Sequence, residues 1–125
     1  MSEHEPTYTR QHGPLQVPVR VLRFEDQIAS LQKEPAWQRG ERAAKTLVKE
    51  GRLRVVLTLM RAATELHEHK TEGATTIQCL SGRMKVNSLG RSIELIEGEM
   101  IALDGGVPHA VEAIGESAFL LTIAD

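Results

Sequence analysis

Aromatic residues are scarce in this 125-residue chain, which contains Tyr8, Phe24, Trp37 and Phe119. Sites that bind sugars or nucleobases by stacking need several aromatic side chains together, so the composition argues against both kinds of ligand. Cysteine occurs once, as Cys79, which excludes an internal disulfide and is typical of a reducing compartment. We therefore expect a cytoplasmic protein.

Long apolar runs and an excess of one charge are also missing. The apolar runs are far shorter than the ~20 residues needed to cross a bilayer, and no basic segment followed by an apolar stretch opens the chain. Acidic and basic residues are interspersed and give a net charge of −2. This balance offers no electrostatic surface for phosphate backbones or anionic lipid. We expect neither nucleic acid nor a membrane as a partner.

The length of the chain suits one domain with its own hydrophobic core. Residues 1–16 are polar, contain two prolines and one glycine, and lack a sustained apolar period, so they predict a flexible N-terminal arm. Residues 17–125 are then the single folded domain.

The first part of that domain predicts one strand and one helix. Apolar residues alternate over residues 17–22, which indicates a short strand at a sheet edge because Pro18 cannot donate a ladder hydrogen bond. A short helix is expected from Asp26, as its N-terminal cap, to about Lys33, where Pro35 ends it.

From Gly40 onward, short apolar runs alternate with glycine or polar breaks. The first two runs flank Glu50-Gly51 and predict a hairpin. The expected strands cover residues 44–49, 53–60, 75–80, 83–87, 92–96, 100–103, 109–113 and 118–123. So many short strands after a single helix predict an all-β sandwich or closed barrel.

Three histidines lie beside predicted turns. Residues two apart in a strand face the same side, so His67 and His69 are expected to point together and Glu68 to point away. His109 begins a strand directly after the turn of residues 104–108 and is the natural third member. Converging imidazoles suit a divalent first-row metal. The alternative is that all three are ordinary polar residues at strand ends and turns.

The spacing of these residues resembles the two motifs of the cupin superfamily, G-x5-H-x-H-x3-4-E-x6-G and G-x5-P-x-G-x2-H-x3-N. The matching residues are His67, His69 and Gly82 in the first motif and Gly98, Gly106 and His109 in the second. From about residue 53 to the end, the chain is similar to a small single-domain cupin of the RmlC-like type. The resemblance implies a double-stranded β-helix (jelly-roll) barrel with an inward pocket, frequently a divalent metal held by the motif histidines and glutamate, and a homodimer.

The chain departs from the first motif at the metal-binding carboxylate. Thr75 stands where the glutamate belongs, and the segment before it is one residue longer than the pattern. Arg61, Asp104 and Ala113 replace the first glycine, the proline and the final asparagine, which are not ligands in the pattern. The site would therefore hold iron, manganese, nickel, copper or zinc through three histidines and water, or hold no metal.

Other residues near the histidines complete the expected pocket. If Thr75 faces inward, Ile77 and Cys79 face inward too and form an apolar wall, in which Cys79 acts as a small hydrophobe. Glu72, in the turn after His69, is a candidate extra ligand, and its alternative is a solvated turn residue.

Three functions remain open from the sequence. The first is a metal-dependent enzyme that acts on a small organic molecule through the three-histidine site. The second is a metal-free barrel that binds a small molecule. The third is a dimeric interaction protein that associates through its N-terminal segment or an edge strand.

Overall fold

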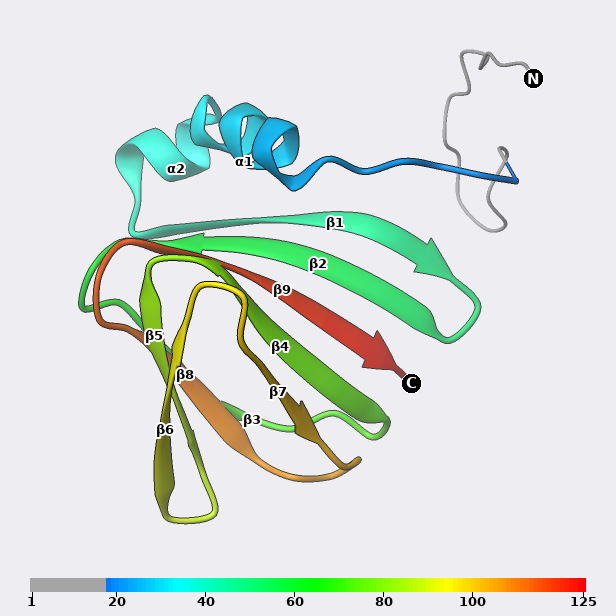
Figure 1. Ribbon diagram of the computed structural model, residues 1–125, viewed down its shortest axis with the longest axis vertical. Coiled ribbons are helices and arrows are strands. Elements are labelled where there is room, and N and C mark those ends of the chain that lie inside the picture. The colour runs from blue at the N-terminus through cyan, green and yellow to red at the C-terminus, as the bar shows by residue number, and fades with distance from the viewer. Residues whose placement is uncertain (1–17) are drawn as a thin grey trace.

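Nine β-strands follow two short helices in the computed structural model, which describes residues 18–125 (Figure 1). The arm expected over residues 1–16 lies outside the described residues. The elements are α1 (Phe24–Gln32), α2 (Pro35–Arg39), β1 (Arg42–Glu50), β2 (Leu53–Met60), β3 (Glu65–His69), β4 (Ala74–Ser81), β5 (Arg83–Ser88), β6 (Arg91–Ile96), β7 (Met100–Leu103), β8 (His109–Ala113) and β9 (Ser117–Ala124). Within this part of the chain, no helix has the length and apolarity that a membrane span requires.

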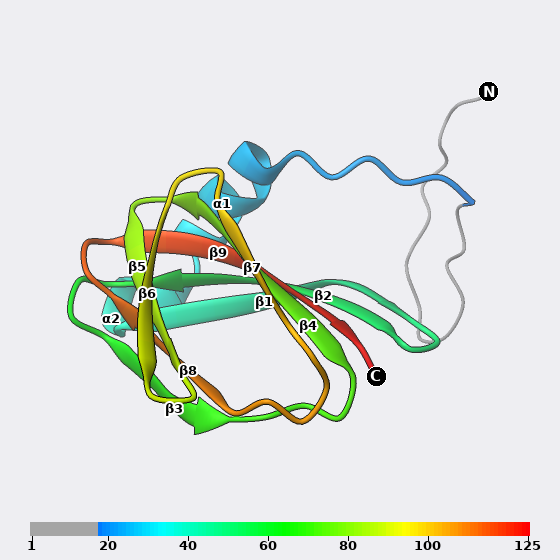
Figure 2. The same ribbon diagram turned by 60° about the horizontal axis from the view of Figure 1, so that its bottom comes forward.

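The strands form two antiparallel sheets that face each other (Figure 2). The five-stranded sheet has the order β1-β2-β9-β4-β7, and the four-stranded sheet has the order β3-β8-β5-β6. This arrangement confirms the expected jelly-roll barrel. Each strand expected after Gly40 is present with its ends within two residues of the prediction, and β3 is the strand that carries His67 and His69.

The main hydrophobic core lies between the sheets because alternate residues of each strand point inward. In β8, for example, His109, Val111 and Ala113 are buried while the residues between them are partly exposed. The buried residues of this core are Met60, Ile77, Cys79, Met84, Val86, Leu95, Leu103, Val111, Ala113 and Phe119.

A second, smaller core attaches the helices to the outside of the five-stranded sheet. Leu31 of α1 and Trp37 of α2 are buried against Leu57 and Leu59 of β2. Arg61 fastens α2 further, because its guanidinium lies 3.8 Å above the Trp37 ring and donates a 2.9 Å hydrogen bond to the Trp37 carbonyl.

The expected N-terminal helix is confirmed, but its ends differ from the prediction. α1 begins at Phe24, its N-cap is Arg23, and no side chain caps it, so Asp26 lies within the first turn. Pro35 does more than end this helix, since it starts α2 at a first-turn position where its missing N–H is not needed.

The edge strand expected over residues 17–22 is wrong for its described part, residues 18–22, which form no strand. Val19 and Val21 are 74% and 68% exposed, so their alternation does not mark a buried face. β1 occupies the edge of the five-stranded sheet instead.

Gly82 offers a direct test of this fold, because a Cβ at this position would lie 2.2 Å from the Glu116 carbonyl oxygen in a backbone with φ of +82°. Gly51 is a matched control, with φ of +58° and open space around it. Gly51→Ala should destabilise the protein by about 1–2 kcal/mol through the left-handed backbone, and Gly82→Ala by about 1–3 kcal/mol more through the clash. Urea unfolding measures both, and equal losses would contradict the close approach.

Candidate functional site

A β-bulge in β3 determines where the motif histidines lie. Leu66 pairs with Val111 of β8, and the next pair is His69 with His109, so three steps along β3 match two steps along β8. The extra residue breaks the regular alternation of sides. The expectation that His67 and His69 point together depends on that alternation, which the structure does not keep.

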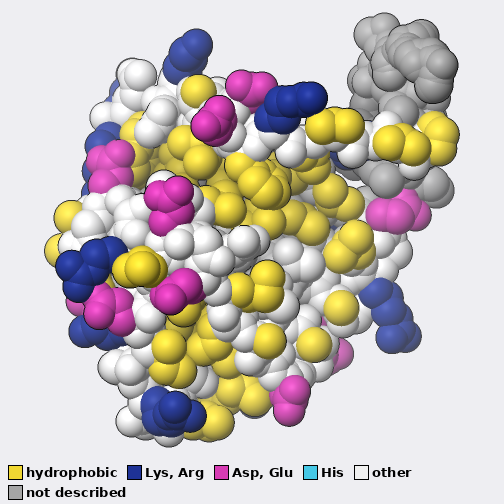
Figure 3. Space-filling view, in the orientation of Figure 1, with side chains coloured by type: hydrophobic (Ala, Val, Ile, Leu, Met, Phe, Trp, Pro, Cys, Tyr) yellow, Lys and Arg dark blue, Asp and Glu magenta, His cyan; other side chains and the backbone are white. Residues whose placement is uncertain are grey.

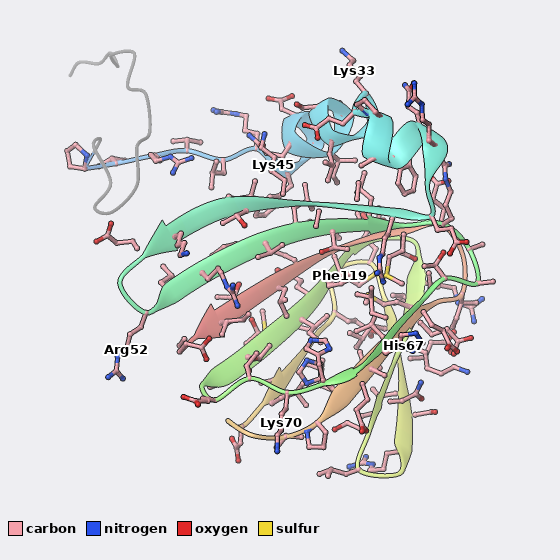
Figure 4. All side chains as sticks on the ribbon, turned by 180° about the vertical axis from the view of Figure 1, so that it is seen from behind. Lys33, Lys45, Arg52, His67, Lys70 and Phe119 are labelled. Atoms are coloured by element: carbon pink, nitrogen blue, oxygen red, sulfur yellow. The ribbon has the colours of Figure 1, made fainter. Side chains whose placement is uncertain are left out.

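The bulge brings His69 and His109 into contact. Their ring centroids are 4.4 Å apart, with the ring planes at 60°. His109 is 1% exposed, whereas His69 is exposed at the edge of the sheet. His67 is also exposed and lies on the β3 ribbon where Figure 4 labels it. Two of the three predicted histidines therefore come together in the structure.

Backbone carbonyls orient both rings of this pair. The Nδ1–H of His109 donates to the Val107 carbonyl, and the Nδ1–H of His69 donates to the His67 carbonyl, each over 3.1 Å. A carbonyl can only accept, so each Nδ1 carries a proton, and the neutral form of either ring then has its lone pair on Nε2. The Nε2 of His109 is buried and has no hydrogen-bond partner in residues 18–125.

This donor set fits a divalent metal. A buried nitrogen lone pair without a partner is costly, and a metal ion would satisfy it. Metal-binding histidines are commonly held through their other ring nitrogen by a carbonyl, as both rings are here. No group of three histidine, cysteine or acidic side chains suited to a metal occurs in the described chain. His69 and His109 would thus hold an ion together with water or a bound molecule.

The other predicted pocket residues lie on the inner side of β4 or in the turn before it. Thr75, Ile77 and Cys79 are all buried there. The Thr75 hydroxyl lies 2.7 Å from the Thr71 hydroxyl, so it is engaged in a hydrogen bond rather than free for an ion. Glu72 is exposed and belongs to no metal-binding group among the described residues.

Two features of the site were missed by the sequence reasoning. The carbonyls that orient the rings belong to His67 and Val107, and a backbone group leaves no residue-type signal. Ser88 fixes the β7–β8 loop, because its hydroxyl donates a 2.7 Å hydrogen bond to the Pro108 carbonyl next to His109. Ser88 and Pro108 are distant in sequence, so no local pattern links them.

The fold and this histidine pair define a cupin barrel, and the sequence comparison gives the same answer. The cupin domain family matches residues 55–124, more than half of the chain, so the chain belongs to the cupin family. No curated protein matches it.

Solved structures share the fold at low sequence identity. A conserved protein of unknown function from Streptococcus pyogenes is 24% identical with a TM-score of 0.65, over 68% of this chain and 75% of that chain. A cupin-2 domain containing protein from Shewanella frigidimarina is 16% identical with a TM-score of 0.67, over 84% and 95%. Salicylate 1,2-dioxygenase from Pseudoaminobacter salicylatoxidans, solved with gentisate, is 20% identical with a TM-score of 0.74, over 82% of this chain and 32% of that chain. This chain thus spans about a third of the dioxygenase.

The buried Cys79 gives a pH-dependent prediction. Burial, with a smaller effect of the Glu97 and Glu99 charges, raises the pKa of its thiol above the usual 9.0. Above that pH the thiol ionises in the unfolded chain but stays protonated in the folded one, so the free energy of unfolding should fall as pH rises. Denaturant unfolding between pH 7 and 11 should show a steeper fall for the native protein than for Cys79→Ala. Parallel pH profiles would contradict a buried thiol.

Proposed function

We propose that this cupin is a metal-dependent enzyme that acts on a small organic molecule at the pair formed by His69 and His109. The observation that carries the proposal is the buried Nε2 of His109, which has no partner within residues 18–125. The contact with the ring of His69, whose Nδ1 also has a carbonyl partner, supports it. The likeness of the barrel to a dioxygenase solved with gentisate supports a small-molecule role at the level of fold.

The residues of the chain would prepare the site for a reaction in several ways. The Val107 and His67 carbonyls favour the tautomer of each neutral ring in which the Nε2 lone pair is available to an ion. Ile77 and Cys79 are buried on the inner side of β4 and make that part of the barrel interior apolar. A bound ion would supply a Lewis acid or an activated water.

The missing carboxylate gives this site a charge preference. Both imidazoles are neutral ligands, and Thr75, which replaces the motif glutamate, is neutral as well. The positive charge of a divalent ion is therefore not offset by a protein ligand. We infer that the site prefers a substrate with an anionic group over a neutral one.

Metal binding tests the proposal most simply. Protein purified without added metal, then titrated with Co²⁺ or Zn²⁺ by calorimetry, should bind one ion per chain. His69→Ala and His109→Ala should abolish this binding, because each removes a ring nitrogen, while circular dichroism shows an intact fold. His67→Ala is the matched variant and should change the affinity by less than about tenfold, since its backbone carbonyl remains.

Unchanged binding in His109→Ala would rule out the pair as the metal site. Absence of binding in the native protein would favour the metal-free alternative, a barrel that binds a small molecule through its apolar interior.

The homodimer implied by the family resemblance is a further prediction. Val19 and Val21 are exposed in a segment that belongs to no sheet, and a second copy would cover such side chains. Analytical ultracentrifugation should show a dimer, which the double substitution Val19→Ser and Val21→Ser weakens at least tenfold. Leu53→Ser, at an exposed position on β2, is the control and should leave it unchanged. A monomer at all concentrations would contradict the prediction.

A further inference from the structure

A groove lies on the side of the barrel where β6 and β7 are neighbours without being paired. β6 ends the four-stranded sheet and β7 ends the five-stranded sheet, and the two strands share no ladder of hydrogen bonds. A cavity of about 340 Å³ lies between them. Figure 3 shows this side, with hydrophobic side chains gathered over the region between the two strands. The residues that line the cavity do not include the histidine pair.

The walls of the groove are mostly aliphatic. Ile93 comes from β6, Ile101 and Leu103 from β7, and Val107 from the loop that follows β7. All four also pack against the main core, so the walls are held in place. Cavities of this size with apolar walls are typical of sites for small organic molecules.

Two opposite charges add specificity to these walls. Arg91 and Asp104 both line the cavity. Neither forms an ion pair within the described chain, where the pairs join Arg61 to Glu116, Arg83 to Glu94 and Lys85 to Glu112. A guanidinium without a partner is suited to a carboxylate, which it can bind through two parallel hydrogen bonds. Asp104 would repel a second carboxylate on the same ligand.

Leu89 is an exposed apolar residue at the rim of the groove, in an unfavourable backbone conformation. Leu89 and Gly90 form the turn between β5 and β6 with φ of +52° and +76°, and Leu89 is 71% exposed. Such turns favour asparagine at the first position, and a leucine there costs about 1–2 kcal/mol. Leu89 lines the cavity, where it would cover an apolar ligand.

We propose that this groove binds a small molecule with an apolar body and one carboxylate. The aliphatic walls and Leu89 cover the body, and Arg91 holds the carboxylate. The proposal goes beyond the metal site and does not depend on it. The two places are neighbours, because Val107 lines the groove and its carbonyl accepts the hydrogen bond of His109.

The groove can be tested with four six-carbon probes, namely hexanoate, hexylamine, 1-hexanol and adipate. The full chain, freed of metal with a chelator, is titrated with each probe, and amide shifts are followed by NMR. Hexanoate should give saturable shifts in residues 88–93 and 101–107, with at least tenfold tighter binding than the amine, the alcohol or the dianion. Binding of hexylamine as tight as that of hexanoate, or the absence of saturable shifts, would overturn the proposal.

Variants then identify the residues responsible. Arg91→Gln should weaken hexanoate binding at least tenfold, whereas Arg52→Gln, at an exposed arginine of another hairpin, should not change it. Leu89→Asn should raise the melting temperature by about 3–5 °C by relieving the turn, and should still weaken hexanoate binding at least threefold. Equal affinity in Arg91→Gln or in Leu89→Asn would overturn the assigned roles.

The variant His109→Ala distinguishes ligand binding in the groove from binding at the histidine pair. The variant should keep the hexanoate affinity of the native protein, because His109 does not line the groove. Loss of hexanoate binding in this variant would show that the groove and the histidine pair form one site. It would overturn the proposal of a separate binding site in the groove.

Discussion

The pairing of β3 with β8 is the constraint from which the candidate site follows. A single extra residue in β3 sets His69 opposite His109, and the burial of β8 then fixes the His109 ring inside the barrel. Without the bulge, regular alternation would place His67 and His69 together on the face of β3 opposite Leu66. The carbonyls two residues before each ring complete the arrangement by fixing the Nδ1 protons.

The structure also shows how the chain accommodates Thr75 in place of the metal-binding glutamate of the family pattern. Thr75 is buried where the motif has a glutamate, and its hydroxyl is satisfied by Thr71, so the substitution leaves no buried charge and no unpaired oxygen. Among the described residues, the buried side-chain atoms without a partner are the Nε2 of His109 and an oxygen of Glu50 at the end of β1. A pair of neutral imidazoles is a weaker site than a set with a carboxylate, and it leaves more positions for a ligand.

Much of the fold could be predicted because antiparallel strands with one buried face have a clear two-residue period, and glycines such as Gly82 mark the turns. The period failed at residues 18–22, where the alternating Val19 and Val21 are both exposed and pack against no buried face. The two-residue period also failed at the bulge in β3, because the residue types of the strand do not reveal where an extra residue is inserted. The histidines were identifiable from spacing, but their contact was not, since it depends on strand register. The groove between β6 and β7 was not predictable because its walls meet only after the barrel closes.

The Nε2 atoms of His69 and His109 are expected to carry lone pairs that can bind a metal ion. Long-range ¹H–¹⁵N NMR of the histidine side chains, recorded on metal-free protein near pH 8 and again after addition of Zn²⁺, tests this directly. We expect a protonated Nδ1 and an unprotonated Nε2 in both rings before the addition, and a large shift of those two Nε2 signals after it. Protonated Nε2 atoms in the metal-free protein, or a Zn²⁺ response confined to other histidines, would contradict it.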